Sequence, residues 1–365
     1  MIRDYIAPLV ITALMTCGLT YSVKAIAEKV GIFDQPGGRK IHLKAIPRLG
    51  GVAIVLAFLI AVTGYSLAAN RLDFGSTKFL FIDQKLIGVI LGAIVLLVVG
   101  IVDDVRGVKP LVKLFWHIVA ATIVVIFGLS ISYIRLPAGL NIEFTNLVLP
   151  FSLLGHSFNF VVWADLATIF WIVLMINTLN FLDGLDGLAS GISVIAAVVI
   201  FFLSLSLAQP AAALLSLIFA GAVLGFMPWN FNPAKIFMGD SGSMFLGYLL
   251  GVLALISGGK VATAFLVLGI PLMDVVWVAF RRLFSGHSMF QADKFHLHHR
   301  LLNAGMTQRQ AVLTLYLISV IFGVVAIFSQ TAGKVQAIIW LLAVMGILVV
   351  LLILLEWKKR RKIKN

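Results

Sequence analysis

The sequence has few charged residues, and acidic residues are particularly scarce. Charged side chains make up 12% of the 365 residues, with 15 acidic against 28 basic ones, and 61% of the chain is hydrophobic. A soluble domain carries about 25% charged residues, so this composition excludes an ordinary soluble protein. A single cysteine, Cys17, excludes an intramolecular disulfide and a zinc site built on several thiolates. No internal repeat is visible, so we expect residues 1–365 to form one membrane domain.

Long apolar runs occupy most of the chain. A helix needs about 20 apolar residues to cross a bilayer. Runs that reach or approach this length lie at about residues 5–26, 49–69, 85–102, 114–134, 166–182, 188–208, 211–227, 244–257, 261–280, 310–329 and 335–356. The predicted fold class is an all-α polytopic membrane protein with about eleven transmembrane helices. The connection at 135–165 alternates β-branched and aromatic residues, which predicts a short hairpin or an interfacial element.

The formal net charge of +13 is distributed unevenly along the chain. Of the 28 basic residues, 21 lie in the alternate segments 24–48, 103–113, 235, 281–309 and 358–364. The positive-inside rule assigns these segments to the cytoplasm, with the N-terminus outside and the C-terminus cytoplasmic. The positive charge is then an orientation signal, and we expect no nucleic-acid partner.

Polar clusters interrupt the apolar pattern on the predicted cytoplasmic side. They occupy residues 37–51, 103–113, 177–191, 230–243 and 281–309. Polar groups left unpaired in hydrocarbon are costly, so such clusters need partners. We therefore expect the five segments to converge on one site at the cytoplasmic edge of the bilayer.

Two adjacent carboxylates, Asp103 and Asp104, close the third apolar run. Neighbouring helix positions point about 100° apart, so we expect the two carboxylates to do different jobs. One would position a cation while the other accepts a proton. The alternative is a simple pair of helix-end carboxylates at the interface.

A second polar group recurs at every third residue between two apolar runs: Asn177, Asn180, Asp183 and Asp186. Gly184 and Gly187 allow the helix to break, which would gather the four side chains around one point. Oxygen ligands of this kind suit Mg²⁺ or Mn²⁺. For Asn177 alone, helix packing is the alternative.

Further clusters carry an acid beside small residues and several basic groups. Asp240 lies in FMGDSGS (237–243), just before a predicted helix, where it serves either a phosphate-binding turn or a plain N-cap. The segment 281–309 contributes His296, His298, His299 and Arg300, which suit a phosphate or pyrophosphate better than zinc. Lys44, Arg48 and Lys113 are either positive-inside anchors or anion clamps. Asp274, in an apolar run, is expected to pair inward with a basic residue.

Oxygen ligands, cations and glycine-lined turns together are typical of phosphoryl transfer. A site at the bilayer edge indicates one lipid substrate and one soluble substrate. An ion-coupled transporter would place its acids near the bilayer midplane and often show inverted repeats, whereas this chain has its acids at one edge and no visible repeat. A phosphotransferase of the CDP-alcohol type needs an Ala-Arg pair after the first Asp-Gly, and DGLDGLASG lacks the arginine.

These clusters, in this order, resemble the polyprenyl-phosphate N-acetylhexosamine-1-phosphate transferases. The matching motifs are the Asp pair at 103–104, NxxNxxDGLDGLA (177–189), FMGDSGS (237–243), HLHH (296–299) and RKIHLKAIPRLGG (39–51). HLHH followed by RLL is similar to the WecA/TagO branch. The MraY branch usually shows three consecutive histidines, a run that Leu297 interrupts here. One departure is His117, where related chains more often have an amide.

The resemblance implies transfer of N-acetylglucosamine-1-phosphate from UDP-GlcNAc to undecaprenyl phosphate in the bacterial cytoplasmic membrane, with release of UMP. The product would start O-antigen, common antigen or teichoic acid synthesis. The alternative is a phospho-MurNAc-pentapeptide transferase of peptidoglycan synthesis. A homodimer is left open, as is a covalent aspartyl intermediate.

The resemblance also implies a role for each candidate residue. Mg²⁺ would be held by Asn180 and Asp240, and the acceptor phosphate would be deprotonated or oriented by Asp103 or Asp104. The nucleotide sugar would be bound by Asp183, Asp186, Phe237, His296, His298, His299 and Arg300. The lipid phosphate would be attracted by Lys44, Arg48 and Lys113.

Overall fold

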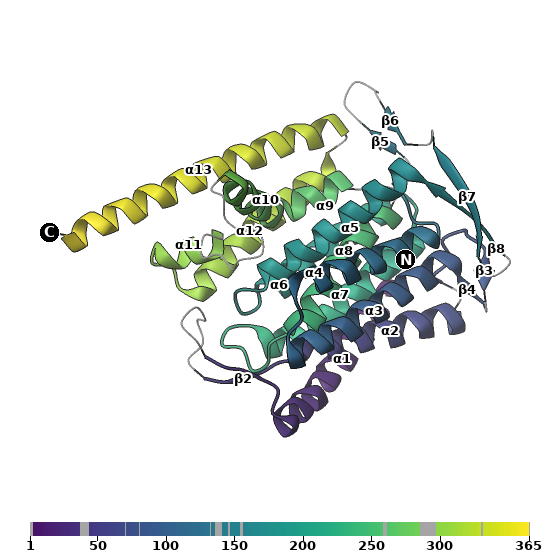
Figure 1. Cartoon of the computed structure of the whole chain (residues 1–365), viewed down its shortest axis with the longest axis horizontal. Helices are drawn as coiled ribbons and strands as arrows, with labels where there is room; N and C mark the ends of the chain where they lie inside the picture. The colour runs from purple at the N-terminus through teal and green to yellow at the C-terminus, as the bar shows by residue number, and fades with distance from the viewer. Residues whose placement is uncertain are drawn as a thin grey trace.

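The computed structural model describes residues 3–36, 44–69, 71–79, 81–131, 133–135, 141–144, 147–153, 156–257, 261–284, 297–329 and 331–364. Within these ranges most of the chain is helical (Figure 1). The helices are α1 (Arg3–Val30), α2 (Gly50–Ala69), α3 (Gln84–Arg106), α4 (Pro110–Ile126), α5 (Val162–Leu182), α6 (Leu188–Ser206), α7 (Pro210–Asn230), α8 (Gly239–Ile256), α9 (Val261–Val267), α10 (Gly269–Phe284), α11 (Leu297–Asn303), α12 (Gln308–Phe328) and α13 (Thr331–Lys364).

Short strands form antiparallel pairs between some of the helices. The pairs are β1 (Phe33–Asp34) with β2 (Ile46–Pro47), β3 (Lys78–Phe79) with β4 (Ile82–Asp83), β5 (Tyr133–Arg135) with β6 (Asn141–Glu143), and β7 (Val148–Leu153) with β8 (His156–Val161). The hairpin predicted in the 135–165 connection is confirmed. Figure 1 shows β3 to β8 at one end of the helical bundle and β2 and α11 at the opposite end, beyond which the C-terminus projects.

Each apolar run predicted from the sequence overlaps one or more helices, and the polytopic helical class is confirmed. The run at 114–134 was predicted too long, because α4 ends at Ile126 and strand β5 begins at Tyr133. Among the described residues, eight helices are long and apolar enough to cross a membrane: α1, α2, α3, α5, α6, α7, α8 and α12. Helix α4 and the apolar part of α13 are shorter, and the run at 261–280 is divided between α9 and α10. The count of eleven and the orientation of the termini therefore stay predictions.

Helix α8 forms the centre of the bundle, where it packs against α2, α3 and α5 and is almost entirely buried. The outward faces of peripheral helices expose large apolar side chains instead. Leu14 on α1 and Phe170 on α5 are each 69% exposed. Large exposed apolar surface is the pattern expected of helices that face lipid.

Glycines bring the first turn of α8 against its neighbours. A Cβ added at Gly51 of α2 would lie 2.0 Å from the backbone nitrogen of Gly242, and one at Gly100 of α3 would lie 2.3 Å from Cα of Ser241. The backbone N–H of Gly51 also donates to the carbonyl oxygen of Met238 at 2.8 Å. Small residues allow such close approach of membrane helices. The RLGG motif thus fixes the start of α8.

Replacing Gly51 with alanine is expected to destabilise the protein by about 1–3 kcal/mol, because its methyl group would overlap backbone atoms that cannot move aside. The matched control is Gly64→Ala in the same helix, where an added Cβ meets no described atom within 4 Å. The control should be neutral or stabilising by about 0.5–1 kcal/mol. Thermal unfolding in detergent measures both variants. Equal melting temperatures for the two would contradict the proposed packing.

Candidate active site

Four polar side chains from four helices meet at the end of the bundle that carries α11. The ammonium group of Lys113 (α4) lies 2.9 Å from Oδ2 of Asp103 (α3) and 2.7 Å from Oδ2 of Asp240 (α8). The Nδ2 of Asn180 (α5) donates to Oδ1 of Asp240 at 3.2 Å and to Oγ of Ser243 at 2.9 Å. The expected convergence of the acidic clusters is thus present in the structure.

The position of Asp240 corrects one sequence expectation. Helix α8 begins at Gly239, so Asp240 lies inside the first turn and not in the loop before it. The glycines and serines of FMGDSGS made the segment look like a loop, but close packing against α2 and α3 keeps it helical.

Asp104 has a different environment from Asp103. Its Oδ1 accepts from the backbone N–H of Asp240 at 2.8 Å, and its Oδ2 accepts from Ser241 N at 3.2 Å and Ser241 Oγ at 2.8 Å. A helix leaves its first N–H groups without internal partners, so Asp104 supplies from α3 the cap that α8 needs. The two adjacent carboxylates therefore make different contacts, as the helix geometry predicted.

Gly239 makes this cap possible. Its φ is +71°, and a Cβ on it would lie 2.4 Å from Oδ2 of Asp104. Any other residue would therefore be strained and would collide with the capping carboxylate.

The predicted break between two apolar runs is confirmed at Gly184 and Gly187. Helix α5 ends at Leu182, α6 begins at Leu188, and Gly187 has a φ of +81°. Asn180 reaches Asp240, whereas Asn177 donates to the carbonyl oxygen of Val173 in its own helix at 2.7 Å. The hydrogen bond of Asn177 therefore stays within α5.

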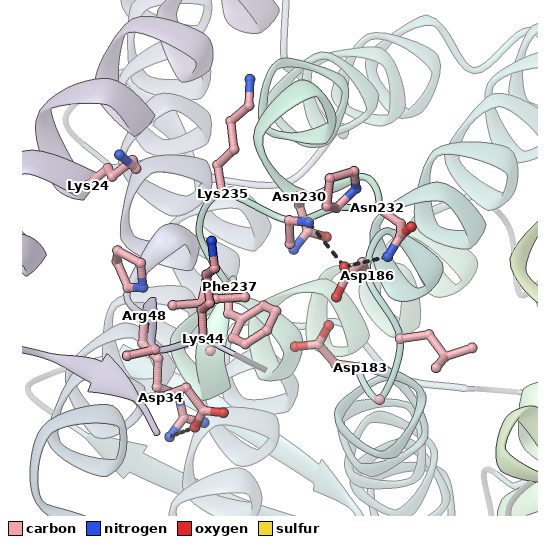
Figure 2. A pocket seen from close by; sticks show the side chains of 18 of the residues that line it. Lys24, Asp34, Lys44, Arg48, Asp183, Asp186, Asn230, Asn232, Lys235 and Phe237 are labelled. Carbon is pink, nitrogen blue, oxygen red and sulfur yellow. Dashed lines mark hydrogen bonds and ion pairs between the residues drawn. The ribbon is translucent and has the colours of Figure 1, made fainter. Parts of the chain in front are cut away.

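A cavity of about 880 Å³ opens beside this cluster, within the range of about 300–1,000 Å³ typical of small-molecule sites. Its lining includes Lys24, Asp34, Lys44, Arg48, Asp183, Asp186, Asn230, Asn232, Lys235, Phe237 and Gln308 (Figure 2). The cations predicted for the lipid phosphate are thus divided. Lys44 and Arg48 line the cavity, whereas Lys113 lies between Asp103 and Asp240.

Asp186 holds one wall of the cavity together. Its Oδ2 accepts from Asn232 Nδ2 at 2.9 Å and from the backbone N–H of Ala234 at 3.0 Å, and Figure 2 shows Asn232 directed toward it. Asn232 also donates to Gln308 Oε1 at 2.7 Å, and the guanidinium group of Arg309 donates to the backbone carbonyl oxygen of Asn232. The loop after α7 is thereby tied to both α5–α6 and α12.

Sequence reasoning assigned no role to two asparagines, Asn230 at the end of α7 and Asn232 in the loop that follows. Asn230 Oδ1 accepts from the backbone N–H of Gly187 at 3.2 Å, and Asn230 Nδ2 donates to the carbonyl oxygen of Ile236 at 3.3 Å. The available signal was NFNP (230–233), in which two amides and a proline directly follow an apolar run.

Negative charge accumulates where the cavity meets the cluster. Desolvation of its carboxyl group, followed by the charge of Asp240, raises the pKa of Asp183 well above its ordinary value, and Arg48 opposes this shift. Although burial works against it, the nearby carboxylates of Asp104 and Asp34 raise the pKa of the Arg48 guanidinium. A cation bound here would relieve the repulsion between Asp183 and Asp240.

The donor atoms fit Mg²⁺ that a substrate helps to hold. No group of three or more His, Cys, Asp or Glu residues converges as a metal cage within the described ranges. Mg²⁺ commonly binds one or two carboxylates and completes its shell with phosphate and water. Asp240 has a carboxylate of this type, and Asn180, whose Nδ2 donates to Asp240, also carries an amide oxygen that a hard cation accepts.

The histidine motif lies only partly within the described residues. His296 is outside them, while His298, His299 and Arg300 belong to α11. Away from this motif, His117 is buried on α4, and its Nε2 lies 3.0 Å from Sδ of Met244 on α8.

The chain is similar to known proteins along most of its length. The model of the family described as glycosyl transferase family 4 matches residues 86–258. A probable undecaprenyl-phosphate N-acetylglucosaminyl 1-phosphate transferase of Bacillus subtilis (strain 168) is 34% identical, over 91% of this chain and 86% of its own length.

Two further relatives cover similar lengths. The decaprenyl-phosphate N-acetylglucosaminephosphotransferase of Mycolicibacterium smegmatis is 32% identical over 94% of this chain and 87% of its own. The undecaprenyl-phosphate alpha-N-acetylglucosaminyl 1-phosphate transferase of Escherichia coli (strain K12) is 26% identical over 96% of this chain and 92% of its own length. The chain therefore belongs to the family of membrane-bound polyprenyl-phosphate N-acetylhexosamine-1-phosphate transferases, in its WecA/TagO-like branch.

Proposed function

We propose that the protein transfers N-acetylglucosamine-1-phosphate from UDP-GlcNAc to undecaprenyl phosphate, giving undecaprenyl-diphospho-GlcNAc and UMP. The observation that carries this proposal is the cluster of Asp103, Lys113, Asn180 and Asp240 beside a cavity that contains Phe237. Such a cluster combines the charges that phosphoryl transfer needs. The product would be the first lipid-linked intermediate of a cell-envelope polysaccharide.

The site is assigned to the cytoplasmic face of the bacterial inner membrane. The support is the distribution of basic residues, since the segments that build the site are those the positive-inside rule assigns to the cytoplasm. A UDP-sugar is a soluble cytoplasmic molecule, and undecaprenyl phosphate would enter from the bilayer.

The nucleotide sugar would occupy the cavity. Phe237 would stack on the uracil ring, and Asp183 and Asp186 would face the nucleoside and diphosphate. Because Lys44 and Arg48 line the same cavity, their charges favour the donor diphosphate over the lipid phosphate. His296, His298, His299 and Arg300 would bind the phosphate on the sugar side.

In the proposed reaction an oxygen of undecaprenyl phosphate attacks the phosphorus of the sugar-1-phosphate group. The bond from that phosphorus to the oxygen of UMP breaks, and UMP leaves. Asp103 accepts the proton carried by a monoanionic acceptor phosphate, and Lys113 offsets the charge of the attacking group. Mg²⁺ held by Asp240 and Asn180, with Mn²⁺ as a substitute, would supply charge neutralisation at the diphosphate.

The expected result in nanodiscs is release of UMP from UDP-GlcNAc only when both undecaprenyl phosphate and Mg²⁺ are present. Chelation with EDTA should abolish the release, and added Mg²⁺ should restore it. The same assay with UDP-MurNAc-pentapeptide separates the two branches of the family. If the pentapeptide donor reacts and UDP-GlcNAc does not, the proposed donor is wrong.

A further inference from the structure

Asp274 connects an apolar helix to the start of the histidine motif. It lies on α10, and its Oδ1 accepts a hydrogen bond from the backbone N–H of Leu297 at 2.9 Å. Leu297 is the first residue of α11 and is only 4% exposed. This contact holds the backbone at the point where α11 begins. The pairing of Asp274 with a basic residue, expected from the sequence, stays a prediction.

The other end of α11 is fixed by a tight turn. The backbone N–H of Ala304 donates to the carbonyl oxygen of Arg300 at 2.9 Å, and Gly305 follows with a φ of +108°. Thr307 then opens α12 with a capping box closed by Gln310. Helix α11 therefore leads rigidly into α12.

The start of α12 is joined to the nucleotide cavity. Gln308 accepts from Asn232, which donates to Asp186 as well, and Gln308 itself lines the cavity. At the other end of α11, Leu297 and Asp274 enclose a small second cavity together with Leu182, the residue before Asp183. Both ends of α11 are thus anchored to segments that build the site.

We propose that Asp274 is a positioning residue that sets the place of α11, and hence of His298, His299 and Arg300, against the nucleotide cavity. It would act through the backbone of Leu297 without touching the substrate. Loss of its acceptor would release the first turn of α11, while the connection through Gln308 would still hold the last turn. The kinetic part of this inference rests on the proposed function.

Amide hydrogen exchange tests the contact directly. In Asp274→Leu, peptides covering 297–303 should exchange about tenfold faster than in the wild type, because a buried N–H loses its partner. Asp274→Asn keeps an acceptor oxygen and should retain protection. Ser319→Ala is the matched control, since Ser319 lines the same small cavity and is buried without a hydrogen bond to described residues. Unchanged exchange in Asp274→Leu would overturn the inference.

Steady-state kinetics test the consequence. Asp274→Leu should raise the KM for UDP-GlcNAc about tenfold and leave the KM for undecaprenyl phosphate unchanged, while Asp274→Asn and Ser319→Ala stay near wild type. A general loss of activity together with a lowered melting temperature would indicate a merely structural role and overturn the inference. A wild type that releases no UMP would refute the proposed function instead, and the exchange experiment would still decide the role of Asp274.

Discussion

Replacing Asp240 with asparagine is expected to lower the rate of UMP release by about a thousandfold, the loss typical of removing a preorganised electrostatic group. Asp240 on α8 is the point where four helices meet. Its two carboxylate oxygens contact Lys113 of α4 and Asn180 of α5, and Lys113 also contacts Asp103 of α3. Asparagine has nearly the same shape, but it removes the negative charge and turns an NH₂ group toward Lys113 or Asn180. The proposed Mg²⁺ ligand is lost in the same step.

Two measurements decide this prediction: UMP release in nanodiscs and the melting temperature. The control is Asp73→Asn, an exposed acid at the opposite end of the bundle that lies 2.7 Å from Lys78. Exposed ion pairs contribute little, so this variant should keep activity within about twofold. If Asp240→Asn were nearly as active as the control, the charge of Asp240 would have no part in the reaction.

The variants Asp103→Asn and Asp104→Asn should differ in what they lose: the first mainly activity, the second mainly stability. Asp103→Asn is expected to lower activity by about 10²–10⁴-fold, the contribution of a general base, with little change in stability. An asparagine oxygen can still accept from the backbone N–H of Val108, which lies 2.6 Å from Asp103 Oδ1. The pH–rate profile of this variant should lose the rise with pH that deprotonation of the base produces.

Asp104→Asn should instead destabilise the protein by about 1–3 kcal/mol, because its amide NH₂ would face a donor at the start of α8 and leave it unpaired. Activity would fall through displacement of Asp240, and any residual activity should keep the wild-type pH profile. Thermal unfolding and pH–rate profiles of the two variants provide the comparison. A stable Asp104→Asn enzyme that has lost the rise with pH would assign the base to Asp104.

Features encoded locally could be predicted from the sequence. The apolar runs predicted the helices, and the glycines at 184 and 187 predicted the break between α5 and α6. The different environments of Asp103 and Asp104 followed from helix geometry alone. The convergence of the polar clusters was inferred from the cost of unpaired polar groups in a membrane and from their shared side.

Features that depend on distant contacts could not be predicted. The start of α8 was placed too late because Gly239 and Ser241 are poor helix formers, and their helical state depends on Asp104 from another helix. The separation of Lys113 from Lys44 and Arg48 depends on tertiary packing. Helix α4, which carries Lys113, packs against α3 and α5, whereas α2, which follows Lys44 and Arg48, packs against α1, α7 and α8. The roles of Asn232 and Asp274 arise from hydrogen bonds to backbone or loop groups that leave no periodic pattern.

The cap that Asp104 provides for α8 also has a consequence for biosynthesis. The two partners are 136 residues apart in the chain, so at a translation rate of about 5–20 residues per second Asp104 is made roughly 7 to 27 s before Asp240. Until α8 arrives, the nascent chain has Asp104 without the N–H and hydroxyl groups that it binds in α8, and it has no reaction centre. The protein therefore gains its activity only when the eighth helix docks, which makes activity a report of completed membrane insertion.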